Sequence, residues 1–237
     1  MYGFVITSAI NTHFGVFSPK ERMKQTIKTI VSIRRAIPNT RIALLEASPR
    51  PLPEEWTAVL RKSVNVFADY TRNTQLQQMH SKLGKLFDCV KSFMELSILL
   101  DFYQNPKVQH FFPDMKRIFK ISGRYYLNEQ FSIQRYTYEH ANKFVFAPPV
   151  KSQFPLESVQ IPLQYMSRLY SFDINLLPQM KSTLDQMMSY LLEQFNRGSY
   201  VDVEHLLYQF TPRSSISLLS PIGISGQLAS TGQTVSD

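Results

Sequence analysis

Cysteine is almost absent from this sequence, which excludes two common ways of stabilising a fold, disulfide bonds and structural zinc sites. The 237 residues include one cysteine, Cys89, and no group of Cys and His residues has zinc-finger spacing. A single cysteine cannot form an intramolecular disulfide, and the spacing gives no structural zinc site. This cysteine usage is typical of a reducing compartment. We therefore expect a cytoplasmic protein, in the host cytoplasm if it is viral.

Long apolar segments are absent as well. The longest stretch without a charged residue, 214–236, is rich in Ser, Thr and Gly, so it lacks the sustained apolar character of a membrane span. The N-terminus, MYGFVITSAINTHFG, has no basic residues before its apolar part and is typical of a first core strand rather than of a signal peptide. We expect no transmembrane segment.

The composition is that of a packed globular protein. Hydrophobic residues make up 43% of the chain and charged residues 19%, which excludes a disordered chain. The net charge of +8 favours an anionic partner, namely nucleic acid, anionic lipid or a phosphate-bearing small molecule. The basic residues are spread along the chain, so a solvated basic surface explains the charge equally well.

Strands and helices alternate in the first half of the chain. Apolar, β-branched runs predict four strands, at 2–10, 41–48, 64–70 and 117–127. The first helix begins at a capping box formed by Ser18 and Glu21 and ends near residue 38. A short helix follows the second strand, and apolar residues at helical spacing from Leu76 to Ile98 predict a helix of about seven turns.

This alternation predicts an α/β fold with a mostly parallel sheet flanked by helices. The second half is less regular: runs at 143–149 and 167–172 predict strands, while 176–195 and 203–210 predict amphipathic helices. The segment from Ser214 onwards predicts a loose strand pair or a flexible end. We find no internal repeat and no linker that divides the chain.

In a parallel sheet, ligands bind outside the carboxyl ends of the strands. The four early strands are followed by residues 7–8, Glu46, Asp69 and residues 122–124, which we expect to share one crevice. In the segment KISGRY (120–125), a glycine permits close approach of the backbone to a phosphate, and the guanidinium fork of Arg124 matches phosphate oxygens. Lys120 alternates with these residues and could share their face. The alternative is a strand with a lysine edge and a glycine bulge.

Four segments together resemble a known family. They are FVITSAIN (4–11), RIALLEAS (41–48), KSFMEL (91–96) and FKISGRYYLN (119–128). They are similar to a small glycosyltransferase-like family with the GT-A fold, found in bacteria and phage, and the resemblance spans most of residues 2–210. It implies a Rossmann-like nucleotide-binding fold and an enzyme that transfers a sugar from a nucleotide-sugar donor.

The resemblance implies a division of labour within one domain, residues 1–237. The nucleotide-sugar-binding half would cover 1–127, the acceptor and catalytic half 128–213, and a tail 214–237. The donor, which we expect to be a UDP-sugar, would pass its sugar to a saccharide or another hydroxyl acceptor.

The resemblance also implies donor-binding residues. Thr7 and Ser8 would line the nucleotide pocket, and Glu46 and Asp69 would accept hydrogen bonds from the ribose or the base. Both acids could instead cap the next helix. Lys91 would reach the diphosphate, although it also forms an ordinary i, i+4 pair with Glu95.

One departure from the family concerns the metal. Many GT-A enzymes carry an Asp-x-Asp motif at the end of the fourth strand, where it holds a divalent cation, Mn or Mg, on the donor diphosphate. Here Ser122, Gly123 and Arg124 occupy that place. Two alternatives follow: Lys120 and Arg124 neutralise the diphosphate themselves, or a metal takes its ligands from elsewhere in the chain.

The catalytic base implied by the resemblance lies in YVDVEHLL (200–207). Glu204, near the start of a predicted helix, matches the acidic residue that removes the acceptor proton in many GT-A enzymes. Asp202 and His205 are candidate metal ligands. The alternative is structural, because Asp202 can cap this helix and Glu204 can favour its positive end.

Tyrosines offer an acceptor site. Tyr125 and Tyr126 could pack against a sugar ring, could stack on single-stranded bases, or could belong to the core. The basic charge and the tyrosines therefore keep a second function open, a non-catalytic nucleic-acid-binding or interaction module.

Overall fold

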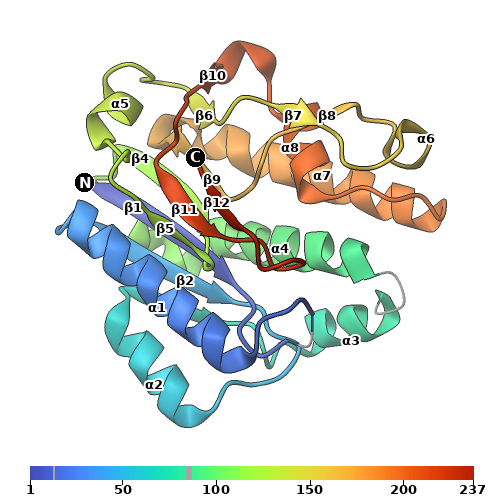
Figure 1. Cartoon of the computed structure of the whole chain (residues 1–237), viewed down its shortest axis with the longest axis horizontal. Coiled ribbons are helices and arrows are strands. Elements are labelled where there is room, and N and C mark those ends of the chain that lie inside the picture. Colours follow the sequence, from blue (N-terminus) through green and yellow to red (C-terminus); the bar gives the residue numbers. More distant parts are fainter. Residues whose placement is uncertain (13, 84–86) are drawn as a thin grey trace.

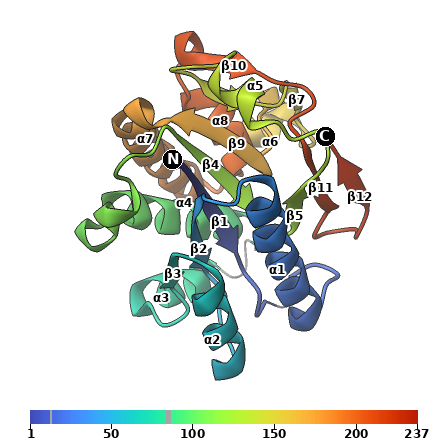
Figure 2. The same ribbon diagram turned by 90° about the vertical axis from the view of Figure 1, so that its left-hand side faces the viewer.

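The computed structural model describes residues 1–12, 14–83 and 87–237. In this part of the chain, a seven-stranded sheet with the order β10-β6-β9-β4-β1-β2-β3 has helices on both faces (Figures 1 and 2). The strands of this sheet are β1 (Tyr2–Ser8), β2 (Arg41–Glu46), β3 (Val66–Asp69), β4 (Arg117–Ser122), β6 (Phe144–Phe146), β9 (Leu169–Asp173) and β10 (Ile216–Leu218). The predicted α/β fold with a mostly parallel sheet is confirmed, since only β9 runs antiparallel to its neighbours in the described sheet.

The structure contains the helices expected from the sequence, in the expected order, and two short helices that the sequence did not predict, at 133–137 and 156–159. They are α1 (Pro19–Ala36), α2 (Glu54–Ser63), α3 (Thr74–Leu83), α4 (Phe87–Gln104), α5 (Ile133–Thr137), α6 (Leu156–Val159), α7 (Leu177–Asn196) and α8 (Val203–Phe210), with short 3-10 helices η1 (Pro106–Phe111), η2 (Ile174–Leu176) and η3 (Arg213–Ser215). The capping box of Ser18 and Glu21 at the start of α1 is confirmed. The single long helix expected after the third strand is instead described as α3 and α4, and residues 84–86, including Leu86, lie outside the described residues.

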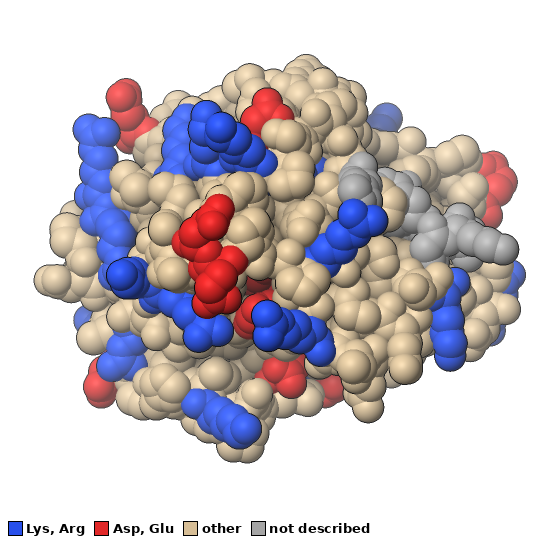
Figure 3. Space-filling model, turned by 90° about the horizontal axis from the view of Figure 1, so that it is seen from below, with Lys and Arg blue, Asp and Glu red and all other residues tan. Residues whose placement is uncertain are grey.

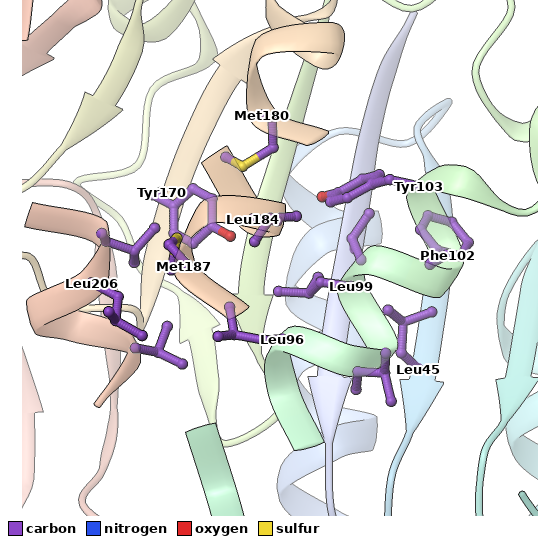
Figure 4. Packing of buried hydrophobic residues seen from close by; sticks show 14 of the residues in the cluster. Leu45, Leu96, Leu99, Phe102, Tyr103, Tyr170, Met180, Leu184, Met187 and Leu206 are labelled. Carbon is purple, nitrogen blue, oxygen red and sulfur yellow. The ribbon is translucent and has the colours of Figure 1, made fainter. Parts of the chain in front are cut away.

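Side chains alternate between the two faces of the sheet, as strand geometry requires. On β1, Phe4 and Ile6 belong to the cluster beneath α1, together with Met23 and Ile30. The intervening Val5 belongs to the cluster on the opposite face, where α4, α7 and α8 pack. Figure 4 shows this second cluster, with leucine and aromatic side chains of α4 meeting methionine and leucine side chains of α7. Two dry layers therefore fix β1 in the centre of the sheet.

The connection order reverses at β1. Its neighbours are β2 on one side and β4 on the other, both parallel to it, with Thr7 opposite Ser122 and Ser8 opposite Glu46. The connection that follows β1 and the one that follows β4 therefore lead away from each other at the carboxyl end of β1, which leaves room for a ligand there.

The predicted strand 117–127 is two strands in two sheets. β4 ends at Ser122, and β5 (Tyr125–Leu127) joins a separate sheet with the order β12-β11-β5. The break has a packing cause: a Cβ on Gly123 would lie 3.2 Å from Ser8 Cβ and from Thr26 Oγ1, so glycine permits the end of β4 to approach β1 and α1.

Of the two alternatives expected for the segment from Ser214 onwards, a strand pair is present, but it belongs to the three-stranded sheet, and a further strand of this segment joins the seven-stranded sheet. β10 pairs in parallel with β6, while β11 (Ile224–Gln227) pairs with β5 and with β12 (Thr234–Ser236), as the red strands in Figure 1 show. A third small sheet pairs β7 (Val150–Lys151) with β8 (Leu163–Gln164). Across the described ranges, none of the helices has both the length and the apolar character needed to cross a bilayer.

Candidate active site

A cavity of about 610 Å³ opens at the carboxyl ends of β1 and β4. Its walls come from these two strand ends, from α4, from the start of α8, and from the turn 228–230 of the C-terminal segment. Eight residues singled out in the sequence line it: Thr7, Ser8, Lys91, Ser122, Arg124, Tyr125, Asp202 and Glu204. The crevice expected at this edge of the sheet is therefore present, and residues of β1, β4 and α8 line it together.

Five other residues from the sequence analysis do not line this cavity. They are Glu46, Asp69, Lys120, Tyr126 and His205. Gly123 lines a separate hollow of about 10 Å³, too small for more than a water molecule. The following contacts explain where these side chains are used instead.

Glu46 organises the loops after β1 and β2. It is fully buried and accepts hydrogen bonds from the backbone N–H of Ile10 (3.1 Å) and of Ser48 (2.9 Å), and from the hydroxyls of Ser8 and Ser48. Burial raises its pKa, and these hydrogen bonds act in the opposite direction. Asp69 accepts from the backbone and hydroxyl of Thr71, so it stabilises the turn after β3. Neither carboxylate faces the cavity.

Lys120 is buried beneath the cavity floor. Its ammonium group pairs with Glu95 of α4 and donates to the carbonyl oxygen of Ser167 (2.8 Å) and to Ser122 Oγ (3.1 Å). No part of Lys120 is exposed. Lys120 does share the Ser122 face of β4, but its charge is neutralised by Glu95, which itself lines the cavity.

The backbone of the glycine turn is also engaged. Ser122 N–H donates to the carbonyl oxygen of Arg168 (3.0 Å), and Gly123 N–H donates to that of Thr7 (2.9 Å). These two amides hold the ends of β9, β4 and β1 together. Any anion at this edge must therefore be bound by side chains rather than by these N–H groups.

Three arginines gather at the β1–β4 end of the cavity. Arg22 of α1, Arg124 after β4 and Arg168 before β9 all line it. The guanidinium groups of Arg124 and Arg168 lie 6.0 Å and 5.8 Å from the centre of the Tyr125 ring. Burial, with Arg124 as a neighbouring positive charge, lowers the pKa of Arg22 to about 10, and Glu46 acts in the opposite direction. This end of the cavity is strongly positive.

Carboxylates line the same cavity. Glu204, in the first turn of α8, accepts a hydrogen bond of 2.5 Å from the hydroxyl of Ser167. Burial raises the pKa of Glu204 to about 7, and the negative charges of Asp202 and Glu95 act in the same direction. A carboxylate with this pKa can both hold and release a proton at neutral pH, which is the property that a general base requires.

Asp202 and His205 form a helix cap. Asp202 accepts from the backbone N–H of His205 (3.0 Å), and His205 Nδ1 lies 2.6 Å from the same carboxylate oxygen. His205 is fully buried, and its Nε2 lies 2.9 Å from Ser152 Oγ. In the described ranges, no group of three or more His, Cys, Asp or Glu residues could hold a metal ion. The cap that the sequence left as an alternative is therefore present.

The two tyrosines after the glycine turn have different surroundings. Tyr125 lines the cavity but is 2% exposed, and its backbone carbonyl oxygen accepts from Thr29. Tyr126 lies under the ammonium group of Lys28 of α1, 3.4 Å from the ring centre. Other aromatic side chains line the cavity near Glu204, and the rings of Phe154 and Tyr200 lie 4.5 Å apart.

The cavity is also lined by residues that were not predicted from the sequence, namely Arg22, Arg168, Ser167 and the aromatic pair Phe154 and Tyr200. Arg22 lies in the first turns of the helix that follows β1. The alternation of strands and helices in the sequence was therefore enough to predict that Arg22 lies near the carboxyl end of that strand. Arg168 and Ser167 precede an antiparallel strand, and the beginning of such a strand meets the ends of its parallel neighbours. Nothing in the sequence marks 169–173 as antiparallel.

No family model and no curated protein matches this sequence. Solved structures do. Core-mannan synthase A from Aspergillus fumigatus, in a Mn/GDP form, has a TM-score of 0.55 at 9% identity, covering 94% of this chain and 73% of its own. Galactosyltransferase LgtC, in complex with donor and acceptor sugar analogues, has a TM-score of 0.55 at 10% identity, covering 91% and 72%.

The mannosyltransferase Ktr4p from S. cerevisiae has a TM-score of 0.56 at 8% identity, covering 94% of this chain and 69% of its own. At these identities the likeness concerns the fold. The chain has the GT-A fold, as the sequence resemblance implied.

Proposed function

We propose that this protein is a glycosyltransferase that moves a sugar from a nucleoside-diphosphate donor to a hydroxyl group of an acceptor. One observation carries the proposal: in a GT-A fold, a single cavity is lined both by a cluster of arginines and by a carboxylate whose pKa is raised to about 7. These are the two electrostatic requirements of the reaction, because negative charge develops on the leaving diphosphate and a proton leaves the acceptor.

The donor would lie along the β1–β4 end. Arg124 can bind diphosphate oxygens through its planar fork of donors, and Thr7 and Ser8 border the same part of the cavity. We retain a UDP-sugar as the proposed donor, with GDP-sugars as the comparison, since two of the structural neighbours were solved with GDP. Glu46 and Asp69 are left out of this donor site because their oxygens are used by the loops that follow β2 and β3.

The acceptor would enter beside Glu204. A carboxylate oxygen of Glu204 accepts the proton of the acceptor hydroxyl while the hydroxyl oxygen forms a bond to the anomeric carbon. The bond between that carbon and the diphosphate oxygen breaks, and its electron pair leaves with the diphosphate. Ser167 orients the carboxylate through its 2.5 Å hydrogen bond. The apolar faces of Phe154 and Tyr200 suit a sugar ring, so we propose a saccharide acceptor.

Donor turnover tests this proposal directly. Purified protein is incubated with a panel of UDP- and GDP-sugars, with and without Mn²⁺, and the release of nucleoside diphosphate is measured beside calorimetric binding of UDP and GDP. We expect one nucleotide to bind selectively and its sugar donor to be consumed. Absence of nucleotide binding under every condition would refute the proposal.

Two variants separate binding from chemistry. Arg124→Ala should weaken donor binding by about 10- to 100-fold, because it removes a guanidinium group from the proposed diphosphate site. Glu204→Gln should bind donor as the wild type does but should not transfer the sugar. Equal loss of binding and transfer in Glu204→Gln would contradict its role as the base. Glu157→Gln, an exposed change on α6, is the matched control.

The nucleic-acid-binding alternative has less support. On the face seen in Figure 3, Lys and Arg side chains are dispersed among Asp and Glu side chains rather than gathered in a stripe. Tyr126, a candidate for base stacking, is covered by Lys28. Binding of single-stranded nucleic acid that weakens steeply with salt would favour the alternative.

A further inference from the structure

In many GT-A enzymes, acidic side chains at the end of the fourth strand hold a divalent cation. In this protein the side chains around that place are basic. β4 ends at Ser122, and Arg124 follows it at the cavity wall. A metal at this position would face the guanidinium groups of Arg22, Arg124 and Arg168. Since like charges repel strongly in a partly buried site, the residues present do not suit a divalent cation here.

The carboxylates of the cavity are also committed to other groups. Glu95 pairs with the buried ammonium group of Lys120, and Asp202 holds both the backbone and the ring of His205. Glu204 accepts from Ser167 and has its pKa raised to about 7 by burial, so it is a poor ligand for a cation. Within the described ranges, no set of three metal-ligating side chains exists to replace the missing Asp-x-Asp motif.

The arginines, in contrast, have N–H groups without an acceptor among the described residues. Among the described residues, the side chain of Arg124 makes no hydrogen bond or ion pair, and its buried Nε has no partner. The buried Nε of Arg168 likewise lacks a partner in the described part of the chain, while its Nη1 contacts Asp237 at 3.2 Å. A buried N–H group without an acceptor is unfavourable, so these groups favour a ligand that supplies acceptors.

Arg22 completes the group from a third element. It is 5% exposed, and two of its nitrogens donate to the carbonyl oxygens of Phe14 and Phe17, which fixes the side chain against the loop that precedes α1. Its remaining Nη1 has no hydrogen bond to any described residue. Arg22 therefore brings a preoriented charge, because its rotamer is already set before a ligand binds.

We propose that Arg22, Arg124 and Arg168 form a pyrophosphate site that takes the place of the divalent cation, so that the donor binds without metal. This inference rests on the proposed function for its ligand. Three guanidinium charges, one of them shared with Asp237, leave two positive charges for the two negative charges of a sugar nucleotide. When the donor reacts, the added negative charge of the released nucleoside diphosphate is met by the same fixed donors.

Calorimetry in the presence and absence of metal tests the inference. UDP, GDP and inorganic pyrophosphate are titrated into the full chain, once in EDTA and once in Mn²⁺. We expect a nucleoside diphosphate to bind with the same Kd, within about threefold, under both conditions. Arg124→Ala and Arg168→Ala should each weaken this binding by about 10- to 100-fold, as the loss of charged hydrogen bonds implies.

Two controls keep the result interpretable. Arg35→Ala removes an exposed arginine of α1 and should leave Kd unchanged. Arg168→Lys keeps the charge but loses the planar fork, so it should fall between wild type and Arg168→Ala, and thermal unfolding confirms that each variant is folded.

The outcomes distinguish this inference from the proposed function. Nucleotide binding that requires Mn²⁺ would overturn the inference and leave the transferase proposal standing. Metal-free binding of pyrophosphate, with no preference for a nucleoside diphosphate, would support the anion site and contradict the donor. Absence of binding by all three ligands would overturn both.

Discussion

Replacing Glu204 by glutamine should raise the stability of the protein at high pH while it stops sugar transfer. Burial and neighbouring carboxylates raise the pKa of Glu204 from 4.5 to about 7 in the folded state. A raised pKa means that the folded protein holds this proton more tightly than the unfolded chain does. Between pH 4.5 and about 7 the wild type therefore loses stability as pH rises.

The size of the effect follows from the same pKa values. A change from 4.5 to about 7 corresponds to about 3 kcal/mol, and this cost is present above pH 7, where the half-buried carboxylate of Glu204 is ionised in the folded protein. Glutamine keeps the shape and can still accept from Ser167, yet it carries no charge. For a chain of this length, about 3 kcal/mol corresponds to roughly 6–12 °C in Tm.

Thermal unfolding of both proteins at pH 4.5 and pH 8 measures this difference. We expect the Tm of Glu204→Gln relative to the wild type to rise between the two pH values, and donor turnover to fall by about 10²- to 10⁴-fold. In the wild type, turnover should increase with pH and level off above about pH 7, since only the ionised carboxylate accepts a proton. A Tm difference that does not change with pH would refute the reasoning, as would a variant that retains turnover.

Three further changes test the surroundings of the site. Lys120→Met should destabilise the fold by roughly 3–5 kcal/mol in urea unfolding, because it leaves the Glu95 charge unpaired, and Glu95→Gln in the same chain should restore at least half of that loss. Gly123→Ala places a Cβ 3.2 Å from two side-chain atoms, so we expect about 1 kcal/mol of destabilisation and nucleotide binding weakened about 10-fold; unchanged calorimetry would show that the turn tolerates the methyl group. Gly15→Ala forces a side chain into φ +86° and 2.3 Å from the carbonyl oxygen of Ala229, so proteolysis should cut the 228–230 turn faster than in the wild type, and equal rates would contradict the contact.

The sequence was sufficient for the four parallel strands of the first half of the chain. Apolar runs and helical spacing located β1 to β4 and the helices between them, because each is a local pattern imposed by burial on two faces. The capping box at Ser18 also follows from four adjacent residues. The break at Gly123 did not follow, because it depends on the contact of Gly123 with Ser8 and Thr26, which are distant in the chain.

The candidate site divides in the same way. Arg124 and Glu204 could be predicted to line the cavity, because Arg124 follows a strand and Glu204 lies at the start of a helix. Both elements can be recognised from the spacing of apolar residues in the sequence. The sequence could not exclude Lys120 from the donor site. Its buried ion pair with Glu95 joins β4 to α4, and the spacing of a lysine along a strand does not show which carboxylate will neutralise it. Arg168 required the antiparallel direction of β9, which is a property of the whole sheet.

The central claim is that the donor diphosphate binds where β1 and β4 end, among side-chain guanidinium groups. A crystal structure with a bound nucleoside diphosphate, grown in EDTA, tests it most directly. We predict diphosphate oxygens within hydrogen-bond distance of Arg124 and Arg168, with Glu204 lining the same cavity and no metal bound to the diphosphate. A nucleotide bound elsewhere on the molecule, or a diphosphate in this cavity that does not contact these arginines, would contradict the account.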